Sequence, residues 1–399
     1  MRWYQLLCVT LLLPLCLAAS AQQQPRVFVL NADFLAEQRQ KVLASPTEYE
    51  RALTAIREMA DRALLEGPWS VMDKKYVPPS GDKHDYMSVG PYWWPDPLKP
   101  DGLPYIRRDG ETNPERYEYD SSRMKSMVHA VVTLARAWYF TDDARYAERA
   151  VLLLRTWFLD TATKMNPHLQ YGQAIRGITE GRDIGIIDTA TMVQLIDAVG
   201  LLQLADAWSD SDQSELQQWF RAYLDWLLTS AHGRSEASRT NNHAVWYHVQ
   251  VASFALFVGD LDTAKQVFES VGPRLIDKQV EPDGRLPKEL ARTRPFQYTT
   301  MTLRGFLNLA SMGEQVGVDI WRYRSDDGRG LEQALHWFEP FVAGRADWEY
   351  PQIAPYDPSL AALLYRRAAR VFDKPSFNRI AASVDDPVVD LTYPLPEPN

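Results

Sequence analysis

The chain has 399 residues and a formal net charge of −9, with 52 Asp and Glu against 43 Lys and Arg. An acidic chain of this kind is a poor partner for nucleic acid, because phosphate binding requires a basic face. A polyanionic sugar would meet the same repulsion, so its binding would require the few basic residues to gather in one groove. No linker divides the chain, and we expect one domain over residues 22–399.

The N-terminus has the composition of a secretory signal peptide. Arg2 is followed by a mainly apolar stretch from Leu6 to Ala18 and then by Ala19-Ser20-Ala21. The stretch is too short for a membrane span, which takes about 20 residues, and the small residues after it suit a cleavage site. We therefore predict removal of residues 1–21 and a periplasmic or secreted mature protein without a membrane attachment.

Both cysteines, Cys8 and Cys16, lie within this signal. The mature chain would then hold no thiol, which excludes disulfides, a cysteine nucleophile and cysteine-ligated zinc. A lipoprotein signal at Cys16 is the alternative, but Leu15 stands where such signals carry a small residue. An exported chain without disulfides suits a Gram-negative periplasm.

From Pro46 onward, segments of helical period alternate with connections rich in proline and glycine, and strand-like alternation is scarce. Apolar residues recur at i, i+3, i+4 and i+7 in ten segments. These predicted helices are residues 49–65, 123–140, 144–158, 189–208, 213–231, 242–258, 261–271, 300–316, 331–342 and 358–371. Helical hairpins spaced by about 40–50 residues, without a repeat consensus, predict an all-α fold, an (α/α) toroid or an incomplete α/α barrel.

Two segments interrupt this pattern. Residues 76–120 hold many prolines, glycines and aromatic residues, which predicts a long irregular loop. A loop longer than about 15 residues is usually functional, although its rings could instead pack against helix ends. The tail, residues 385–399, has four prolines and is expected to be extended.

The segment Asn241-Asn242-His243 introduces the predicted helix 242–258. Asn241 could act as an N-cap, a role typical of asparagine. Capping does not explain a second Asn followed by His243, which would lie in the first helical turn beside partly positive amides. There the neutral imidazole is favoured, and a neutral imidazole can accept a proton.

A basic approach to the helix 300–316 brings Arg292, Arg294 and Tyr298 together. They could belong to a surface loop in which Arg292 pairs with Glu289 and the ring of Tyr298 is buried. Together with Asn242 and His243, they also form the set that β-elimination at a uronate requires.

In that reaction the weakly acidic C5 proton leaves only when the adjacent carboxylate is neutralised. Asn amides and Arg guanidinium groups are suited to this neutralisation. A Tyr beside an Arg could ionise more readily than usual, take the C5 proton and return one to the departing oxygen. The reaction calls for no metal and no cofactor.

Several motifs give the chain a resemblance to the alginate lyase family of helical toroid enzymes. They are Lys83-His84-Asp85-Tyr86, Pro91-Tyr92-Trp93-Trp94-Pro95-Asp96-Pro97, Asp109-Gly110-Glu111-Thr112-Asn113-Pro114, Met165-Asn166-Pro167, Gly181-Arg182-Asp183-Ile184-Gly185-Ile186-Ile187-Asp188, Asn241-Asn242-His243 and Glu289-Leu290-Ala291-Arg292. The resemblance implies cleavage of an acidic polysaccharide by β-elimination, with Asn242, His243, Arg292 and Tyr298 as catalytic residues.

The loop and the motifs also indicate residues that bind substrate. We expect these to be Asn241, Arg294, Lys83, His84, Tyr86, Tyr92, Trp93, Trp94 and Arg182. Ala244-Val245 and the short spacing from Arg292 to Tyr298 depart from the longest-known members, which allows Arg294 to replace Arg292. These departures indicate a sister branch, in which polymannuronate is the expected substrate and glucuronate, the C2 epimer of mannuronate, is the alternative.

Two other classes of protein remain open on sequence. A toroid glycoside hydrolase would use paired carboxylates among Glu180, Asp183, Asp188 and Glu289, and a polysaccharide-binding protein would need only the aromatic loop and arginines. The histidines show no His-x-x-x-His or His-Glu-x-x-His pattern, so no metal site is predicted.

Overall fold

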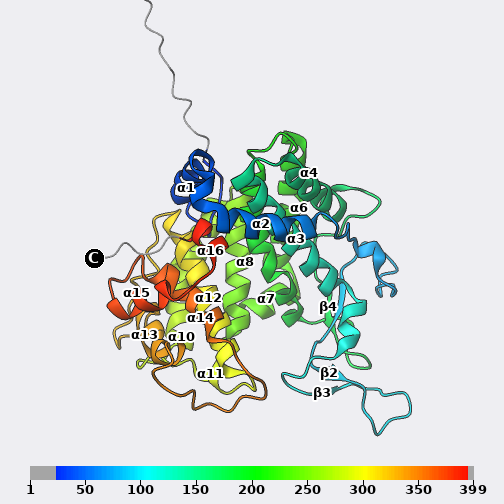
Figure 1. The fold of residues 1–399 in the computed structure, drawn as a ribbon. Coiled ribbons are helices and arrows are strands. Elements are labelled where there is room, and N and C mark those ends of the chain that lie inside the picture. Colours follow the sequence, from blue (N-terminus) through cyan, green and yellow to red (C-terminus); the bar gives the residue numbers. More distant parts are fainter. Residues whose placement is uncertain (1–23, 394–399) are drawn as a thin grey trace, which may run out of the picture.

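The computed structural model describes residues 24–393, so the predicted signal, residues 1–21, lies outside the described residues. The described chain is mainly helical, which confirms the predicted all-α class (Figure 1). Its longer helices are α1 (Ala32–Ala44), α2 (Glu50–Ala63), α3 (Asp120–Thr141), α4 (Ala144–Leu154), α5 (Met192–Leu202), α6 (Asp210–Thr229), α8 (Asn242–Val258), α9 (Leu261–Val271), α12 (Pro295–Glu314), α13 (Leu331–Val342) and α14 (Pro358–Ala368).

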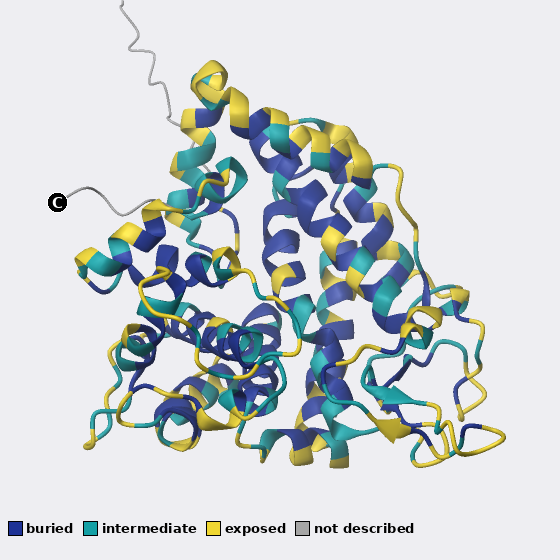
Figure 2. Cartoon of the chain, turned by 60° about the horizontal axis from the view of Figure 1, so that its bottom comes forward, coloured by how far each residue is buried: buried dark blue, intermediate teal, exposed yellow. Residues whose placement is uncertain are grey.

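The helices form two layers around a hollow. In the inner layer, α3 packs on α5, α5 on α8, α8 on α12 and α12 on α14. In the outer layer, α2 and α4 cover α3, α6 and α9 cover α8, and α13 covers α12 and α14. Buried residues follow the contacts between the layers (Figure 2). This is the predicted toroid of helical hairpins.

Each of the ten predicted helices has a counterpart, and the shifts at their ends have local causes. Helix α6 begins before the predicted residue 213 because Ser209 and Asp212 form a reciprocal capping box. The helix predicted over residues 189–208 corresponds to α5. Its predicted start at residue 189 falls in a 3₁₀ segment, Asp183–Thr191, which precedes α5. Asp143 and Asp357 cap α4 and α14.

The prediction of an extended tail was wrong for its described part. Helix α16 (Pro387–Thr392) lies there and packs against α2 and α1, so the last described helix meets the first ones (Figure 1). Pro387 occupies the first helical turn, where its missing N–H costs nothing, and the Asp386 side chain accepts from the amides of Val388 and Val389. Helices α1, α7 (Ala231–Ala237), α11 (Pro287–Leu290) and α15 (Pro375–Ala382) were also not predicted.

The loop 76–120 is irregular, as predicted, but it carries three short strands. Strand β1 (Met87–Val89) pairs in parallel with β4 (Tyr171–Ala174), with Met87 opposite Tyr171. Strand β2 (Trp93–Trp94) pairs antiparallel with β3 (Ile106–Arg107), with Trp93 opposite Arg107. The loop ends in a 3₁₀ turn, Pro114–Glu118, which leads into α3.

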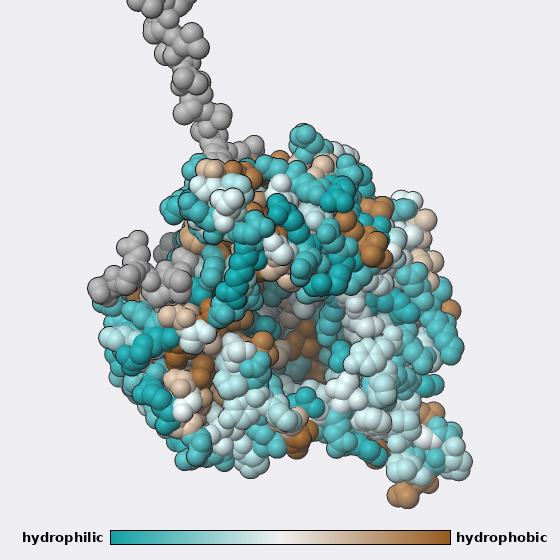
Figure 3. Space-filling view, viewed as in Figure 1, coloured by the Kyte–Doolittle hydropathy of each residue, from teal (hydrophilic) through white to brown (hydrophobic). Residues whose placement is uncertain are grey.

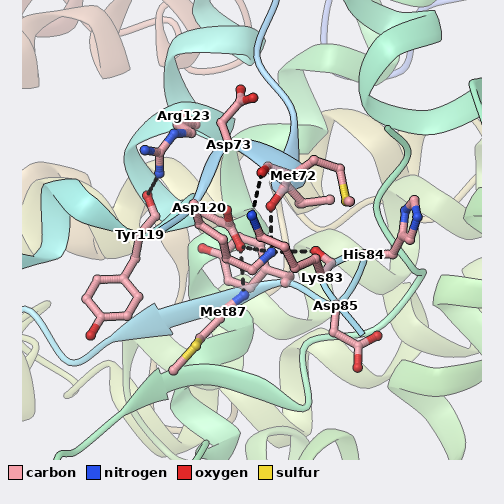
Figure 4. A network of polar contacts seen from close by, with 12 residues as sticks. Met72, Asp73, Lys83, His84, Asp85, Met87, Tyr119, Asp120 and Arg123 are labelled. Carbon is pink, nitrogen blue, oxygen red and sulfur yellow. Dashed lines mark hydrogen bonds and ion pairs between the residues drawn. The ribbon is translucent and has the colours of Figure 1, made fainter. Parts of the chain in front are cut away.

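A buried ion pair fixes the base of this loop to α3 (Figure 4). Lys74 Nζ lies 3.1 Å from Asp120 Oδ2, and both side chains are fully buried. Lys74 also donates to the carbonyls of Val71 and Lys83, at 2.6 and 2.7 Å, while the amide of Met87 donates to Asp120 at 2.9 Å. Burial lowers the pKa of Lys74 and raises that of Asp120 to about 6, so each charge depends on the other.

One described helical stretch, Asp183–Leu202, is long and apolar enough to cross a membrane. Most of it is buried inside the protein, and α5 within it belongs to the inner layer. Its apolar character is therefore explained by the core.

Candidate active site

A cleft of about 510 Å³ opens at one end of the toroid. The surface is hollowed between the part that carries α11 and α12 and the part that carries β2 to β4 (Figure 3). The cleft is lined by Pro91, Tyr92, Trp93, Arg107, Arg116, Lys125, Gln173, Arg182, Ile184, Ile187, Asp188, Arg239, Asn241, Asn242, His243, Arg292, Tyr298 and Met301. The loop thus forms one wall and the starts of α8 and α12 form the other.

The lining is strongly basic in an acidic protein. Six cationic side chains line the cleft: Arg107, Arg116, Lys125, Arg182, Arg239 and Arg292. Its one lining carboxylate, Asp188, is buried and accepts from the hydroxyls of Tyr86 and Ser88 and from Gln173 Nε2, at 3.0, 2.6 and 3.0 Å. The groove of basic residues that a polyanionic substrate would need is therefore present.

The first turn of α8 presents Asn242 and His243 to the cleft, each held by a buried glutamate. Glu289 accepts from the backbone amide and the Nδ2 of Asn242, at 2.7 and 2.8 Å. Glu236 Oε1 lies 2.7 Å from His243 Nδ1. When Nδ1 carries the proton and donates to Glu236, Nε2 is left as an acceptor.

Asn241 stands at the N-cap position, but its side chain makes no capping hydrogen bond. The expectation that Asn241 caps α8 was therefore wrong, and its amide lines the cleft instead. Glu289 satisfies part of the helix start, since it accepts from the Asn242 amide.

Arg292 and Tyr298 form a second group in the same cleft. Arg292 Nη2 donates to the Tyr298 hydroxyl at 2.7 Å, and its guanidinium lies 3.8 Å from the centre of the Tyr298 ring. Arg292 also pairs with Asp109, at 2.9 Å, and the Tyr298 hydroxyl lies 3.0 Å from that of Tyr92. The loop therefore positions the arginine and the tyrosine through Asp109 and Tyr92.

These contacts shift two pKa values in opposite directions. Burial alone would raise the pKa of Asp109, but hydrogen bonds from Arg292, Arg107 and Thr293 lower it to about 2. The pKa of Tyr298 is raised by burial and by Tyr92, and Arg292 offsets only part of this increase. The expectation that Tyr298 ionises more readily than an ordinary tyrosine is thus not met in the free protein, where Tyr298 is a neutral phenol.

The alternative arginine, Arg294, is at the N-cap of α12 and is not among the residues that line the cleft. It lies beside the loop, near Gly110. Of the two candidate arginines, Arg292 is the one that contacts Tyr298.

The structure divides the predicted substrate-binding residues into those that line the cleft and those that do not. Tyr92, Trp93 and Arg182 line the cleft, and the Arg182 guanidinium lies 5.9 Å from the Trp93 ring centre. Trp94 instead faces Arg108 and donates to the Glu111 carbonyl.

Three further predicted residues support the loop rather than line the cleft. Tyr86 is fully buried, and its hydroxyl donates to Asp188. Lys83 Nζ donates to the Met72 carbonyl, and His84 Nδ1 lies 2.6 Å from the Lys164 carbonyl. These partners place all three side chains in the framework behind the cleft.

Several cleft residues were not predicted. Lys125 lies on α3 and lines the cleft, and helical period alone does not show which polar residue of a helix faces a cleft. Gln173 has a φ of +48°, held by hydrogen bonds to Ser88, Asp188 and Arg182, and no sequence signal marks this backbone strain. Arg239 stands two residues before Asn241, and its closeness in sequence to the Asn241-Asn242-His243 motif could have indicated that it lines the cleft.

Comparisons with known proteins agree with this geometry. The sequence matches the alginate lyase family over residues 70–348. The chain belongs to the alginate lyase family. An alginate lyase structure from Bacteroides ovatus shares 39% identity and a TM-score of 0.89, over 93% of this chain and 100% of that one.

More distant members of the alginate lyase family share the fold. Alginate lyase A1-III from Sphingomonas species A1 has 13% identity and a TM-score of 0.55, over 87% of this chain and 95% of that one. A variant of A1-III in complex with a tetrasaccharide aligns equally well, over 94% of its own length. No curated protein matches the sequence.

As an alginate lyase family member, the protein is a polysaccharide lyase with an (α/α) toroid. Three of the four carboxylates that a hydrolase could use hold other groups: Glu289 accepts from Asn242, Asp183 from Ser235 and Arg239, and Asp188 from Tyr86, Ser88 and Gln173. The fourth, Glu180, is not among the residues that line the cleft. Within residues 24–393, no cluster of three or more His, Asp or Glu side chains could hold a metal ion.

Proposed function

We propose that the protein cleaves alginate by β-elimination, with polymannuronate-type linkages as its preferred substrate and glucuronan as the alternative. The observation that carries this proposal is the juxtaposition, in one basic cleft, of a neutral tyrosine and a histidine with a free ring nitrogen. The alginate lyases from Bacteroides and Sphingomonas support the choice of substrate.

The cleft supplies donors for the substrate carboxylate. Asn241, Asn242 and Arg239 line the cleft together with His243, and Arg182 lines it beside Trp93. Their hydrogen bonds would stabilise the charge that spreads onto the carboxylate as the C5 proton leaves. Trp93 and Tyr92 offer faces on which sugar rings can stack.

We assign the two proton transfers to different residues. His243 Nε2 takes the C5 proton, the C5–H electron pair forms the C4–C5 double bond, and the C4–O bond breaks. Tyr298, a neutral phenol in the free protein, gives its proton to the departing oxygen. Arg292 then stabilises the tyrosinate through the hydrogen bond that it already donates, and solvent returns the proton from the imidazolium to the tyrosinate.

The test is to incubate the protein separately with polymannuronate, polyguluronate and glucuronan and to follow the near-ultraviolet absorbance of the 4,5-unsaturated product. We expect the fastest reaction with polymannuronate. Faster turnover of glucuronan would make glucuronan, the alternative, the preferred substrate. The absence of an unsaturated product from all three polymers would reject the assignment as a lyase of polyuronates.

The proton-transfer roles are tested with Tyr298→Phe and His243→Asn. Each should lower kcat by about 10² or more, because general acid–base catalysis contributes about 10²–10⁴. Binding of polymannuronate should persist in both variants, since the arginines and the lysine of the cleft, and not Tyr298 or His243, provide most of its positive charge. Full activity of His243→Asn would assign both transfers to Tyr298.

We also propose that the enzyme acts in the periplasm or outside the cell, on the composition of residues 1–21. N-terminal sequencing of the protein recovered from an expressing Gram-negative host should begin at Gln22. A cytoplasmic protein that keeps Met1 would reject this proposal.

A further inference from the structure

A second, smaller hollow lies on the inner faces of the same helices. Its volume is about 70 Å³, and α3, α5, α12 and α14 line it together with Val29, Leu30 and Tyr393. Helix α3 gives Lys125 to the cleft and Arg136 to this hollow, while α12 gives Met301 to the cleft and Arg304 to the hollow. Spacings of 11 and 3 residues keep each pair on one helix face, so the hollow lies farther along the inside of the toroid.

Three arginines from three helices meet in the lining: Arg136, Arg304 and Arg367. Arg367 is buried and donates to neutral acceptors, the Asn308 Oδ1 at 2.7 Å, the Leu307 carbonyl at 2.5 Å and the Ser311 Oγ at 2.8 Å. Within residues 24–393, neither Arg136 nor Arg304 has a hydrogen bond or an ion pair to a carboxylate. Arg304 has one close charge–ring contact, with its guanidinium 5.4 Å from the Trp246 ring centre.

Arg304 has an unusual environment for an unpaired cation. Its side chain is exposed to solvent, yet protein surrounds it closely enough for burial to lower the pKa of its guanidinium. Burial also lowers the pKa of Arg367. A charged group that has lost part of its hydration without gaining a counterion raises the free energy of the folded protein.

The carboxylate in this lining is already occupied. Asp197 accepts from three successive backbone amides, those of Phe28, Val29 and Leu30, at 2.7, 3.1 and 2.8 Å. Its oxygens are therefore directed at the N-terminal segment, which closes this side of the hollow. Arg136 is near enough to lower the pKa of Asp197, which burial raises to about 6, but the two groups form no ion pair.

We propose that this hollow binds a small oxyanion, of the phosphate or carboxylate class, between Arg136 and Arg304. One water needs about 10–15 Å³ of comparable space, so 70 Å³ admits a compact ion. A saccharide chain needs several times more. The site is thus distinct from the catalytic cleft, and it does not depend on the substrate proposed above.

The first test is the thermal midpoint of unfolding in inorganic phosphate, in acetate and in sodium chloride at the same ionic strength. We expect phosphate or acetate to raise the midpoint of the wild-type protein by about 2 °C or more above chloride. The ion that gives the larger shift identifies which class of oxyanion, phosphate or carboxylate, the site prefers. Equal midpoints in all three salts would overturn the proposal.

The position of the site is tested with the double variant Arg136→Gln/Arg304→Gln. It should lose the shift caused by the oxyanion, whereas Arg322→Gln, which removes an exposed arginine from a surface pair with Asp319, should keep it. If the shift survives in the double variant and disappears in Arg239→Gln, the ion binds in the catalytic cleft and the proposal is wrong.

A crystal of the wild-type protein soaked in selenate keeps the test independent of how the variants fold. The anomalous signal of selenium should place the ion beside Arg136 and Arg304. Selenate found only in the catalytic cleft or only at the outer surface would contradict the assignment.

Discussion

At the residue scale, the central feature of the site is that glutamates fix both functional residues at the start of α8. Glu236 is buried, lies 2.7 Å from His243 Nδ1 and 2.8 Å from Arg239 Nε, and does not line the cleft. It can therefore act on the reaction only through the side chains that it holds, chiefly through the orientation and charge of His243 and also through Arg239. We regard it as a positioning residue.

Replacing Glu236 by Gln tests this role. The amide oxygen can still accept from His243, but the negative charge is lost, so kcat should fall about tenfold while KM changes little. The acidic limb of the kcat profile should move to lower pH, because a neutral amide stabilises the imidazolium less than a carboxylate does. Steady-state kinetics between pH 5 and 9 measure both effects.

Glu339→Gln is the matched control, since Glu339 is also buried and paired with an arginine, Arg345. It should leave the position of the acidic limb unchanged. A Glu236→Gln profile that only drops in height, without moving, would assign Glu236 a structural role.

The sequence could predict those site residues that stand in a recognisable motif, and it could not predict those that act through contacts with distant residues. Asn242, His243, Arg292 and Tyr298 stand in short motifs of chemically distinctive residues, and all four line one cleft. Glu236 and Asp109 act through contacts with residues 7 and 183 positions away, which no motif displays. Asn241 was misjudged because the glutamate that satisfies the helix start lies on another helix, α11.

At the element scale, predictions succeeded where helical period extends over several turns. Helices α8, α9 and α13 begin and end where the apolar period does. The strands of the loop 76–120 are two or three residues long, too short for alternation to be read, and β1 pairs with β4, which lies some 80 residues along the chain. Helix α16 was missed because prolines suggest a break, although one at the first turn starts a helix equally well.

The loop is useful to the site only while its base stays fixed to α3. Asp120→Asn would leave the Lys74 ammonium buried with carbonyl partners alone, and loss of one partner of a buried pair costs about 3–5 kcal/mol. We expect a decrease of this size in the free energy of unfolding, measured in urea. The double variant Lys74→Met/Asp120→Leu should recover most of it, because apolar residues can replace such a pair at little cost.

An exposed pair provides the comparison. Asp143→Asn removes the charge from the surface pair with Arg145 and keeps a side-chain oxygen that can cap α4, so it should cost about 1 kcal/mol or less. Equal costs for Asp120→Asn and Asp143→Asn would show that the buried pair does not hold the loop.

At the scale of the whole molecule, two electrostatic fields of opposite sign act on an acidic substrate. The net charge of −9 repels a polyuronate at long range, whereas six cationic side chains in the cleft attract it at short range. Salt screens the long-range field first, because the Debye length falls from about 30 Å at 0.01 M to about 10 Å at 0.1 M and 3 Å at 1 M. The two effects should therefore be separable by ionic strength.

We expect kcat/KM on polymannuronate to rise as sodium chloride increases from about 0.01 M, to pass through a maximum near 0.1 M and to fall towards 1 M. Arg239→Gln should make the fall less steep, because it removes one of the charges whose attraction is screened there. The rise at low salt should be unchanged in this variant, since its cause is the acidic surface. A decline that begins at the lowest salt would mean that the cleft governs the encounter at every distance and that the net charge of the molecule has no part in it.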